Sequence, residues 1–410
     1  MPHNRARSRI PSSAGGARGA RIARDALECF AVAAPGLEPL VAGELTALGI
    51  APRTAEGGAA FTGSVESIGR ANLWLRAASR ILVRVASFHA RAFHELEQLA
   101  RVVPWERYIA PGAPVRFRVT SRKSRLYHTA AIAERLAGAM AHRLGAASTV
   151  LQAGDVEESN GENVQLFVIR VAHDMFTVSA DSSGAHLHLR GYRQAVGKAP
   201  VRETLAAAML IASDWLATDP LLDPMCGSGT IAIEGAMIAR RIAPGLHRRF
   251  SFLDWPEVES GLWARIREEA ASAIRSDVAA PIRAFDRDAG AIVAARANAE
   301  RAGVGADIEF AVRSISATAT DEGGPRGLVA TNPPYGVRVG EAERLRDLYA
   351  RFGQVLRARL AGWRLALLSA NPRLDAQLRL PLEEQLRTRN GGIPVRLLIG
   401  EIPAGNEIVD

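Results

Sequence analysis

Residues 220–240, with the sequence PLLDPMCGSGTIAIEGAMIAR, decide the fold class of this chain. A short apolar strand ends at Asp223, a loop with Gly227 and Gly229 follows, and an apolar helical pattern fills the rest of the segment. In open α/β sheets, ligands bind at the carboxyl ends of the strands. Glycines let the backbone approach a ligand closely, and a helix N-terminus offers free N–H donors. We therefore predict a nucleotide-type binding loop after Asp223.

Two ligand classes compete for this loop. The pattern G-x-G-x-x-A at residues 227–232 also fits a dinucleotide-binding fingerprint. That fingerprint requires an acidic residue about twenty positions further on, at the end of the next strand. Asp254 falls near that distance, but the nearby Pro256 disfavours a central strand. The segment PIRAFDRD is the better strand, with Asp286 at its end and Asp288 just beyond. An aspartate before the loop would repel a pyrophosphate and suits a cationic sulfonium, which favours a methyl donor.

A second motif, GLVATNPPYG at residues 327–336, fits a site for a planar amine. A strand-like run leads into Asn332, whose backbone is constrained by the following proline. The Asn332 side-chain oxygen and the Pro333 carbonyl can each accept one amino hydrogen, while Pro334 stiffens the turn. Tyr335 can stack on the ring that bears the amine. Alone, the turn fits a proline-rich connection equally well, but the loop upstream favours the amine site.

Taken together, the motifs resemble a known family. Asp223-Pro-Met-Cys-Gly-Ser-Gly-Thr, then Asp286, then Asn332-Pro-Pro-Tyr are similar to class I S-adenosylmethionine-dependent methyltransferases that act on amino groups. More narrowly, HLHLRGYR, APVRETLAAAML, LLDPMCGSGT and NPPYGVRVGE resemble the THUMP-domain guanine-N2 methyltransferases of bacterial 23S ribosomal RNA. The similarity runs from about Leu27 to the C-terminus. We expect a form with a single methyltransferase domain, without the second one fused in some members.

This resemblance implies an α/β fold, in which a Rossmann-like class I methyltransferase domain follows an α+β ferredoxin-like and THUMP RNA-binding region. It implies S-adenosylmethionine as cofactor, with Asp286 on the ribose hydroxyls and Asp223 near the amino-acid tail. The implied cofactor-binding residues are Asp223, Met225, Cys226, Gly227, Gly229, Thr230, Asp286, Asp288 and Asn332. The implied catalytic residues are Asn332, Pro333, Pro334 and Tyr335. One departure is Ser314, which stands where the superfamily usually has an acid on the adenine amine, and Asp321 lies too far along to replace it.

The chain divides into four parts. Residues 1–25 contain six arginines and no acid before Asp25, which predicts a disordered basic tail. We expect a ferredoxin-like unit at 26–86, a THUMP domain at 87–182 and the methyltransferase domain at 190–410. In the THUMP region, Arg116 and Arg118 alternate with apolar residues and so share one face of a strand. They form a predicted RNA-binding set with the cations that follow the strand, namely Arg122, Lys123 and Arg125. A solvated basic face is the alternative, and the resemblance favours RNA.

Composition agrees with an RNA partner. Lys and Arg outnumber Asp and Glu by 51 to 43 among 410 residues. Two cysteines, Cys29 and Cys226, are too few for a disulfide framework or a zinc site, and His186 and His188 lack a third ligand, so we expect no metal. No apolar run reaches the length of a membrane span and no secretory signal is present, which predicts a cytoplasmic protein.

The sequence therefore predicts N2-methylation of a guanine in 23S ribosomal RNA. A flipped guanine would insert against Tyr335, and in-line methyl transfer would depend chiefly on positioning. Three alternatives remain: a transfer-RNA guanine-N2 methyltransferase, a DNA adenine-N6 methyltransferase, which would share the NPPY turn, and a catalytically inactive RNA-binding assembly factor.

Overall fold

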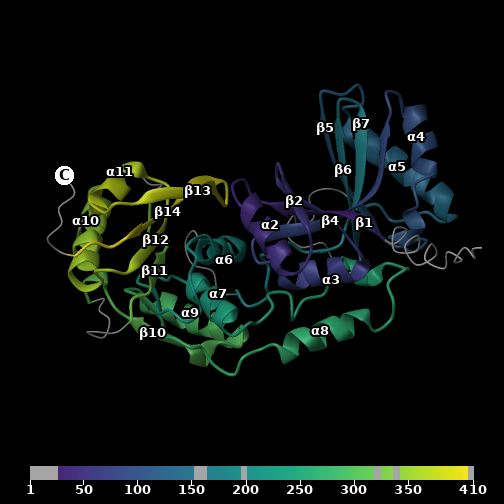
Figure 1. Cartoon of the computed structure of the whole chain (residues 1–410). Coiled ribbons are helices and arrows are strands. Elements are labelled where there is room, and N and C mark those ends of the chain that lie inside the picture. Colours follow the sequence, from purple (N-terminus) through teal and green to yellow (C-terminus); the bar gives the residue numbers. More distant parts are fainter. Residues whose placement is uncertain (1–25, 152–163, 195–200, 318–324, 336–341, 405–410) are drawn as a thin grey trace, which may run out of the picture.

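Two seven-stranded sheets organise the chain, one in each half (Figure 1). The computed structural model describes residues 26–151, 164–194, 201–317, 325–335 and 342–404. The predicted basic tail and Asp321 lie outside these ranges.

The N-terminal sheet has the strand order β2-β3-β1-β4-β7-β6-β5 and is antiparallel except for the parallel pair β5–β6. Its strands are β1 (Leu27–Ala33), β2 (Pro52–Ala55), β3 (Gly58–Gly63), β4 (Ala78–His89), β5 (Val115–Arg122), β6 (Gln165–Ala172) and β7 (Met175–Asp181). Its helices are α2 (Glu38–Ala47), α3 (Val65–Trp74), α4 (Phe93–Arg101) and α5 (Thr129–Leu144). Strand β2 is a short edge strand that begins with a proline and buries no side chain.

Side chains of this sheet alternate between a covered face and an open face. Cys29 of β1, Val83 of β4 and Phe167 of β6 lie in one row of the sheet, with β7 between the last two, and belong to one buried cluster, to which all four helices also contribute. Their neighbours along the strands, such as Glu28 and Arg84, are exposed. The four helices therefore pack on one face of the sheet, and the opposite face carries none of them.

The C-terminal sheet has the order β10-β9-β8-β11-β12-β14-β13; the first five strands are parallel, and β14 is antiparallel to both of its neighbours. The strands are β8 (Leu221–Asp223), β9 (Ile282–Asp286), β10 (Ile308–Val312), β11 (Leu328–Thr331), β12 (Arg364–Ser369), β13 (Glu383–Asn390) and β14 (Ile393–Glu401). The main helices are α6 (Glu203–Ala212), α7 (Thr230–Ala239), α9 (Ala289–Arg301), α10 (Ala342–Arg359) and α11 (Pro372–Asp375). This order confirms the predicted Rossmann-like fold of a class I methyltransferase.

Successive side chains of the parallel strands point to opposite faces of the sheet and enter two different hydrophobic cores. Leu221, Ala284 and Ala330 face a cluster formed with α6, α7 and α9. Leu222 and Phe285 face the other cluster, formed with α10 and α11. Helices thus cover both faces, which leaves the carboxyl edge of the parallel strands as the position for a ligand.

The segment between α7 and β9 connects the two halves. It contains α8 (Leu262–Ser272), which lies beneath α3 in Figure 1. Ile266 of α8 belongs to one buried cluster with Leu73 of α3, while Phe252 and Trp255 belong to the core of the N-terminal half. This segment therefore completes the N-terminal core with residues that come from the methyltransferase half of the sequence.

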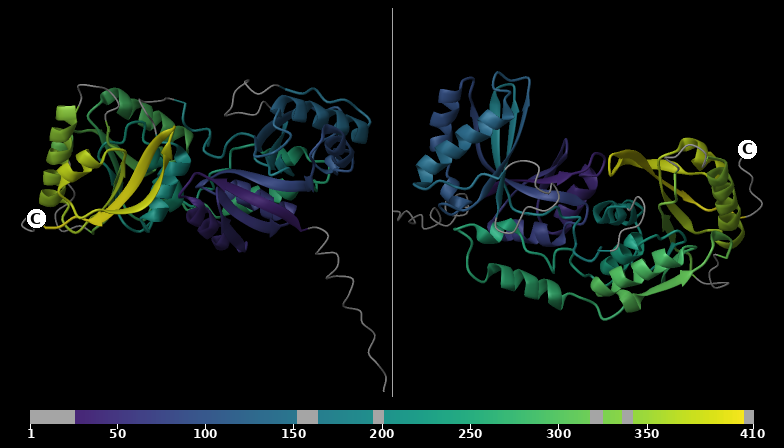
Figure 2. Two further views of the ribbon diagram at one scale, coloured as in Figure 1. Left: turned by 90° about the horizontal axis from the view of Figure 1, so that it is seen from above. Right: turned by 180° about the vertical axis from the view of Figure 1, so that it is seen from behind.

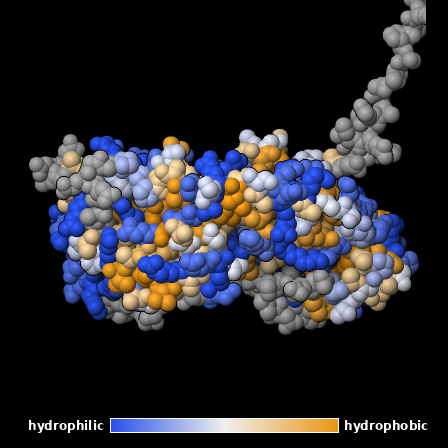
Figure 3. All heavy atoms as spheres, turned by 90° about the horizontal axis from the view of Figure 1, so that it is seen from below, coloured by the Kyte–Doolittle hydropathy of each residue, from blue (hydrophilic) through white to orange (hydrophobic). Residues whose placement is uncertain are grey.

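Strand β4 continues across residue 86, where the ferredoxin-like unit was predicted to end, although its register against β7 shifts between Arg84 and Ala86. One continuous sheet spans both predicted N-terminal units, so their division at this residue stays a prediction. Within the described part of the chain, no helix is long and apolar enough to cross a membrane. Seen from below, the apolar surface patches are broken up by polar and charged residues (Figure 3).

The β13–β14 hairpin of the C-terminal half lies beside the N-terminal half in Figures 1 and 2. At this contact Gly36 has φ +84°, and a Cβ there would lie 2.3 Å from the backbone oxygen of Arg387 in β13. Such an overlap with backbone cannot be relieved by rotating a side chain. Gly36 is therefore required both by its own conformation and by the contact between the two halves.

We expect Gly36→Ala to lower the free energy of unfolding by about 3 kcal/mol, because left-handed strain and overpacking add together. Gly49→Ala is the matched control, since Gly49 has φ +75° but no atom within 4 Å of a Cβ. It should cost only the strain, about 1 kcal/mol. Urea unfolding measures both variants, and equal losses would contradict the proposed contact.

Candidate active site

Asp223 lies at the carboxyl end of β8 and is 1% exposed. Its Oδ1 accepts hydrogen bonds from the Thr331 hydroxyl (2.9 Å) and the Met225 backbone N–H (3.2 Å). Burial raises the pKa of the carboxyl from 3.8 to about 7, the two hydrogen bonds oppose this rise, and the charge of Asp286 adds to it. A cation placed at this edge would favour the ionised form of Asp223.

The glycine loop leads from Asp223 into α7. Gly229 precedes the helix with φ +84°, and a Cβ there would lie 3.0 Å from the Cβ of Ala295, so this glycine permits close packing of α7 on α9. Gly227 has φ +52°, and a Cβ there would meet nothing within 4 Å. The backbone therefore borders open space at Gly227, on the side where a ligand could approach it.

Asp286 fixes the loop to the next strand. Its two carboxylate oxygens accept from the backbone N–H groups of Gly227 (2.9 Å) and Asp288 (3.0 Å). Asp288 uses its own carboxylate to cap α9 through the backbone N–H of Gly290 (2.8 Å). Asp286 is thus a preoriented, half-buried acceptor, whereas a structural role already accounts for Asp288.

The turn that the sequence predicts to be catalytic follows β11. The side-chain oxygen of Asn332 is buried, and it has no hydrogen-bond partner among the described residues. A buried acceptor without a partner costs about 1–3 kcal/mol. A site that bears this cost in the free protein is suited to accept a hydrogen bond from a ligand, since binding would remove it.

Tyr335 is 7% exposed, and its hydroxyl lies 3.3 Å from the side-chain amide nitrogen of Asn390, which donates to it. The hydroxyl of Tyr349 on α10 donates to the backbone oxygen of Pro334 (3.4 Å), while Pro333 is buried. The turn is therefore held from both sides, and little of the Tyr335 side chain is exposed.

The remaining predicted cofactor residues lie in the same loop. Met225 is half-buried, and Thr230 is buried in the first turn of α7. The backbone N–H of Cys226 donates to the Phe285 oxygen (2.9 Å), and burial raises the pKa of its thiol. A protonated thiol is a poor nucleophile, so the buried thiol of Cys226 is unsuited to nucleophilic attack.

Ser314 follows β10 and is exposed; its backbone oxygen accepts from Ala317 (2.9 Å). Beside it, the guanidinium of Arg313 lies 4.4 Å from the ring centre of Phe285. Among the described residues, no three His, Cys, Asp or Glu side chains form a group suited to a metal ion.

The predicted RNA-binding residues lie in the other half, on β5 and at its end. Arg116 is only 8% exposed and Arg118 is half-buried. Arg122, Lys123 and Arg125 are exposed, and Asp174 fixes their loop by accepting from the Arg125 backbone N–H (2.7 Å). The exposed charge therefore gathers at the tip of the strand rather than along it.

Two residues of the site were not predicted from the sequence. Thr331 holds Asp223, and Asn390 holds Tyr335. Thr331 lies within the GLVATNPPYG motif, directly before Asn332, and this adjacency was the available signal. Asn390 lies at the end of β13, and no local pattern connects it with Tyr335.

Two parts of the chain match domains of known protein families. Residues 190–399 match the RMKL-like methyltransferase domain, and residues 28–82 match the RlmL ferredoxin-like domain. The chain belongs to the RMKL-like methyltransferase family. A relative from Syntrophotalea carbinolica, named ribosomal RNA large subunit methyltransferase K/L, is 36% identical over 383 residues, which is 91% of this chain and 53% of that protein. The chain thus spans about half the length of that relative.

Two solved structures are similar to this chain over nearly its whole length. SMU.472, described as a putative methyltransferase complexed with SAH, has a TM-score of 0.81 and 30% identity, with 94% of this chain and 99% of that chain covered. A predicted N6-adenine-specific DNA methylase from Listeria monocytogenes has a TM-score of 0.81 and 32% identity, with 94% and 98% covered.

The pKa of Asp223 predicts a pH dependence of stability. Between about pH 4 and pH 7 the unfolded chain has released this proton while the folded chain still binds it, so stability falls as pH rises through this window. Asp223→Asn removes the ionisation and keeps an oxygen that can accept from Thr331. We expect the difference in Tm, variant minus wild type, to grow from pH 4 to pH 7 and then to level off. A difference that is constant, or that shrinks with pH, would contradict the raised pKa.

Proposed function

We propose that this chain transfers a methyl group from S-adenosylmethionine to the N2 amine of a guanine in 23S ribosomal RNA. The observation that carries the proposal is the buried oxygen of Asn332, which has no hydrogen-bond partner among the described residues and lies at the same sheet edge as Asp223 and Asp286. The names of the S. carbinolica relative and of the SAH complex support the substrate and the cofactor.

The residues at the sheet edge fit the cofactor. Open space at Gly227 admits a ligand against the backbone, and the fixed carboxylate of Asp286 can accept from ribose hydroxyls. Asp223 would face the positively charged part of the ligand, which would offset the cost of burying its carboxylate. When bound, the cofactor supplies an electrophilic methyl group on a sulfonium.

The turn would position the amine. The Asn332 oxygen and the Pro333 carbonyl each accept one amino hydrogen, which draws the nitrogen lone pair out of conjugation and directs it at the methyl carbon. The N–C bond forms as the C–S bond breaks, and the methylated nitrogen then loses its proton to solvent. Positioning supplies most of the rate enhancement, and no strong base is required.

A second buried acceptor favours guanine over adenine. The Asn390 side-chain oxygen is also buried and without a hydrogen-bond partner in the described part of the chain, while its amide holds Tyr335. Guanine presents two neighbouring donors, N1–H and the N2 amine, whereas adenine presents the N6 amine beside an acceptor. Two acceptors near the turn fit the guanine edge. Adenine-N6 methylation, to which the name of the Listeria structure points, would leave one of them unpaired.

RNA is favoured by the N-terminal half. The exposed cations Arg122, Lys123 and Arg125 stand at the tip of a sheet that the methyltransferase reaction does not require. Such cations bind phosphates and fix the register of a nucleic acid. A transfer RNA would meet the same cations, so methylation of purified ribosomal and transfer RNA must be compared.

We expect Asn332→Ala to lower kcat for methylation of ribosomal RNA by about a hundredfold, because the amine is no longer aimed. The affinity for S-adenosylmethionine, measured by calorimetry, should change far less. Asn371→Ala is the matched control: Asn371 also precedes a proline after a parallel strand, but its side chain caps α11.

Near-normal methylation by Asn332→Ala would overturn the role of the turn. Absence of cofactor binding by the wild-type chain would overturn the enzymatic proposal and leave the inactive assembly factor.

A further inference from the structure

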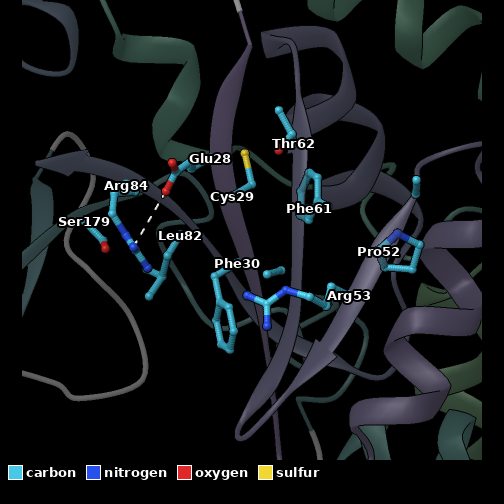
Figure 4. A pocket seen from close by; sticks show the side chains of 12 residues that line it. Glu28, Cys29, Phe30, Pro52, Arg53, Phe61, Thr62, Leu82, Arg84 and Ser179 are labelled. Carbon is cyan, nitrogen blue, oxygen red and sulfur yellow. Dashed lines mark ion pairs between the residues drawn. The ribbon is translucent and has the colours of Figure 1, made fainter. Parts of the chain in front are cut away.

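The open face of the N-terminal sheet contains a hollow of about 570 Å³. It is lined by residues of β1, β2, β3, β4 and β7, and by none of the candidate active-site residues. Figure 4 shows Phe30 and Arg53 directed into it, with the Glu28–Arg84 ion pair on the other side of Phe30. The hollow is therefore separate from the methyltransferase site.

The strand register explains why these side chains meet. Arg53 pairs with Ala60, Ala60 with Phe30, and Phe30 with Leu82, so this row crosses four strands on one face. In the next row Glu28 pairs with Thr62, and Arg84 with Ser179. Because directly paired residues share a face, all of these side chains lie opposite the four helices. Small neighbours, Ala60 and Ser179, leave space beside the larger ones.

The hollow combines three kinds of group. Phe30 is a half-buried aromatic ring in the middle strand of the group. Arg53 is exposed and has no ion pair among the described residues. Arg84 and Glu28 lie 3.6 Å apart, with side chains 44% and 72% exposed, and an exposed pair of this kind contributes little to stability. A stacking surface, an exposed cation and an accessible carboxylate together suit a nucleotide, since it offers a base, a phosphate and amino hydrogens.

The same face continues as a basic track towards the tip of the sheet. Ser179 pairs with Val168, which pairs with Arg118, so the row that contains Arg84 reaches β5. One row further on, Arg170 of β6 is exposed and has no ion pair within the described ranges. A polyanion that entered the hollow could therefore follow cations across the sheet to the exposed cluster at the end of β5.

We propose that this hollow binds one unpaired nucleotide of the RNA substrate. Its base stacks on Phe30, its phosphate binds Arg53, and Glu28 accepts from an amino group of the base. The inference rests on the proposed function, in that it takes RNA as the substrate. Single-stranded nucleic acid is bound in this way, by aromatic side chains on a platform with cations along the backbone. A duplex would keep its bases stacked on one another and could not use Phe30.

The test is the affinity of the full chain for a short, unstructured, fluorescein-labelled single-stranded RNA, measured by anisotropy over a range of salt concentrations without cofactor. Phe30→Leu keeps an apolar side chain and removes the stacking surface, and we expect it to weaken binding about tenfold. Arg53→Ala should reduce the slope of log affinity against log salt by about one. Arg101→Ala, an exposed arginine on α4, on the helical side of the sheet, should change neither quantity.

Kinetics separate this inference from the proposed function. With ribosomal RNA, Phe30→Leu should raise KM and leave kcat unchanged, because the hollow binds ground state and transition state equally. If the wild-type chain methylates RNA but Phe30→Leu binds and reacts as the wild type does, the nucleotide site is refuted. Equal weakening of single-stranded and duplex RNA would also refute stacking. If the wild-type chain neither binds nor methylates RNA, the proposed function itself falls.

Discussion

A buried carboxylate, Glu234 of α7, is the constraint on which the arrangement of the two halves depends. Its side chain is fully buried. The Tyr192 hydroxyl donates to it at 3.0 Å, Arg190 lies 3.5 Å away and Arg76 lies 3.9 Å away. Removing one partner from such a group leaves a buried charge uncompensated, which costs several kcal/mol. Residues from both halves must therefore remain together around α7.

The hydrogen bonds extend outward from this carboxylate. Arg190 donates to the backbone oxygen of Arg76 (2.7 Å), and Arg76 donates to that of Ile242 (2.7 Å), just after α7. Glu44 of α2 accepts from the backbone N–H groups of Arg76 (2.7 Å) and Ala77 (3.0 Å). Burial raises the pKa of Glu44 and lowers that of Arg76. Because α7 begins at the glycine loop, this network fixes the position of that loop relative to the N-terminal sheet, which is proposed to bind RNA.

Local patterns were sufficient to predict the methyltransferase half. Strand β8, the glycine loop and the Asn332 turn each carry their signal within about ten residues, and Asp286 follows from its place at the end of a strand. Contacts between distant segments were not predictable in this way. The bonds from Thr331 to Asp223 and from Asn390 to Tyr335 depend on how strands pair, which no short pattern encodes.

In the N-terminal half, too, local patterns did not predict which distant segments lie together. Alternation correctly placed Arg116 and Arg118 on one face of β5, and the register identifies that face as the open one. Their exposure depends on what covers each position, and Arg116 is in fact buried. The sequence also gave no sign of the hollow at Phe30, because its residues come from five strands that meet only in the folded sheet.

The identity of the methylated nucleoside tests the central claim most directly. The full chain would be incubated with S-adenosylmethionine carrying a carbon-13 methyl group and with ribosomal RNA from a strain that lacks the gene. The RNA would then be digested to nucleosides and analysed by mass spectrometry. We expect the label in N2-methylguanosine; label confined to N6-methyladenosine, or absent from the RNA, would contradict the account.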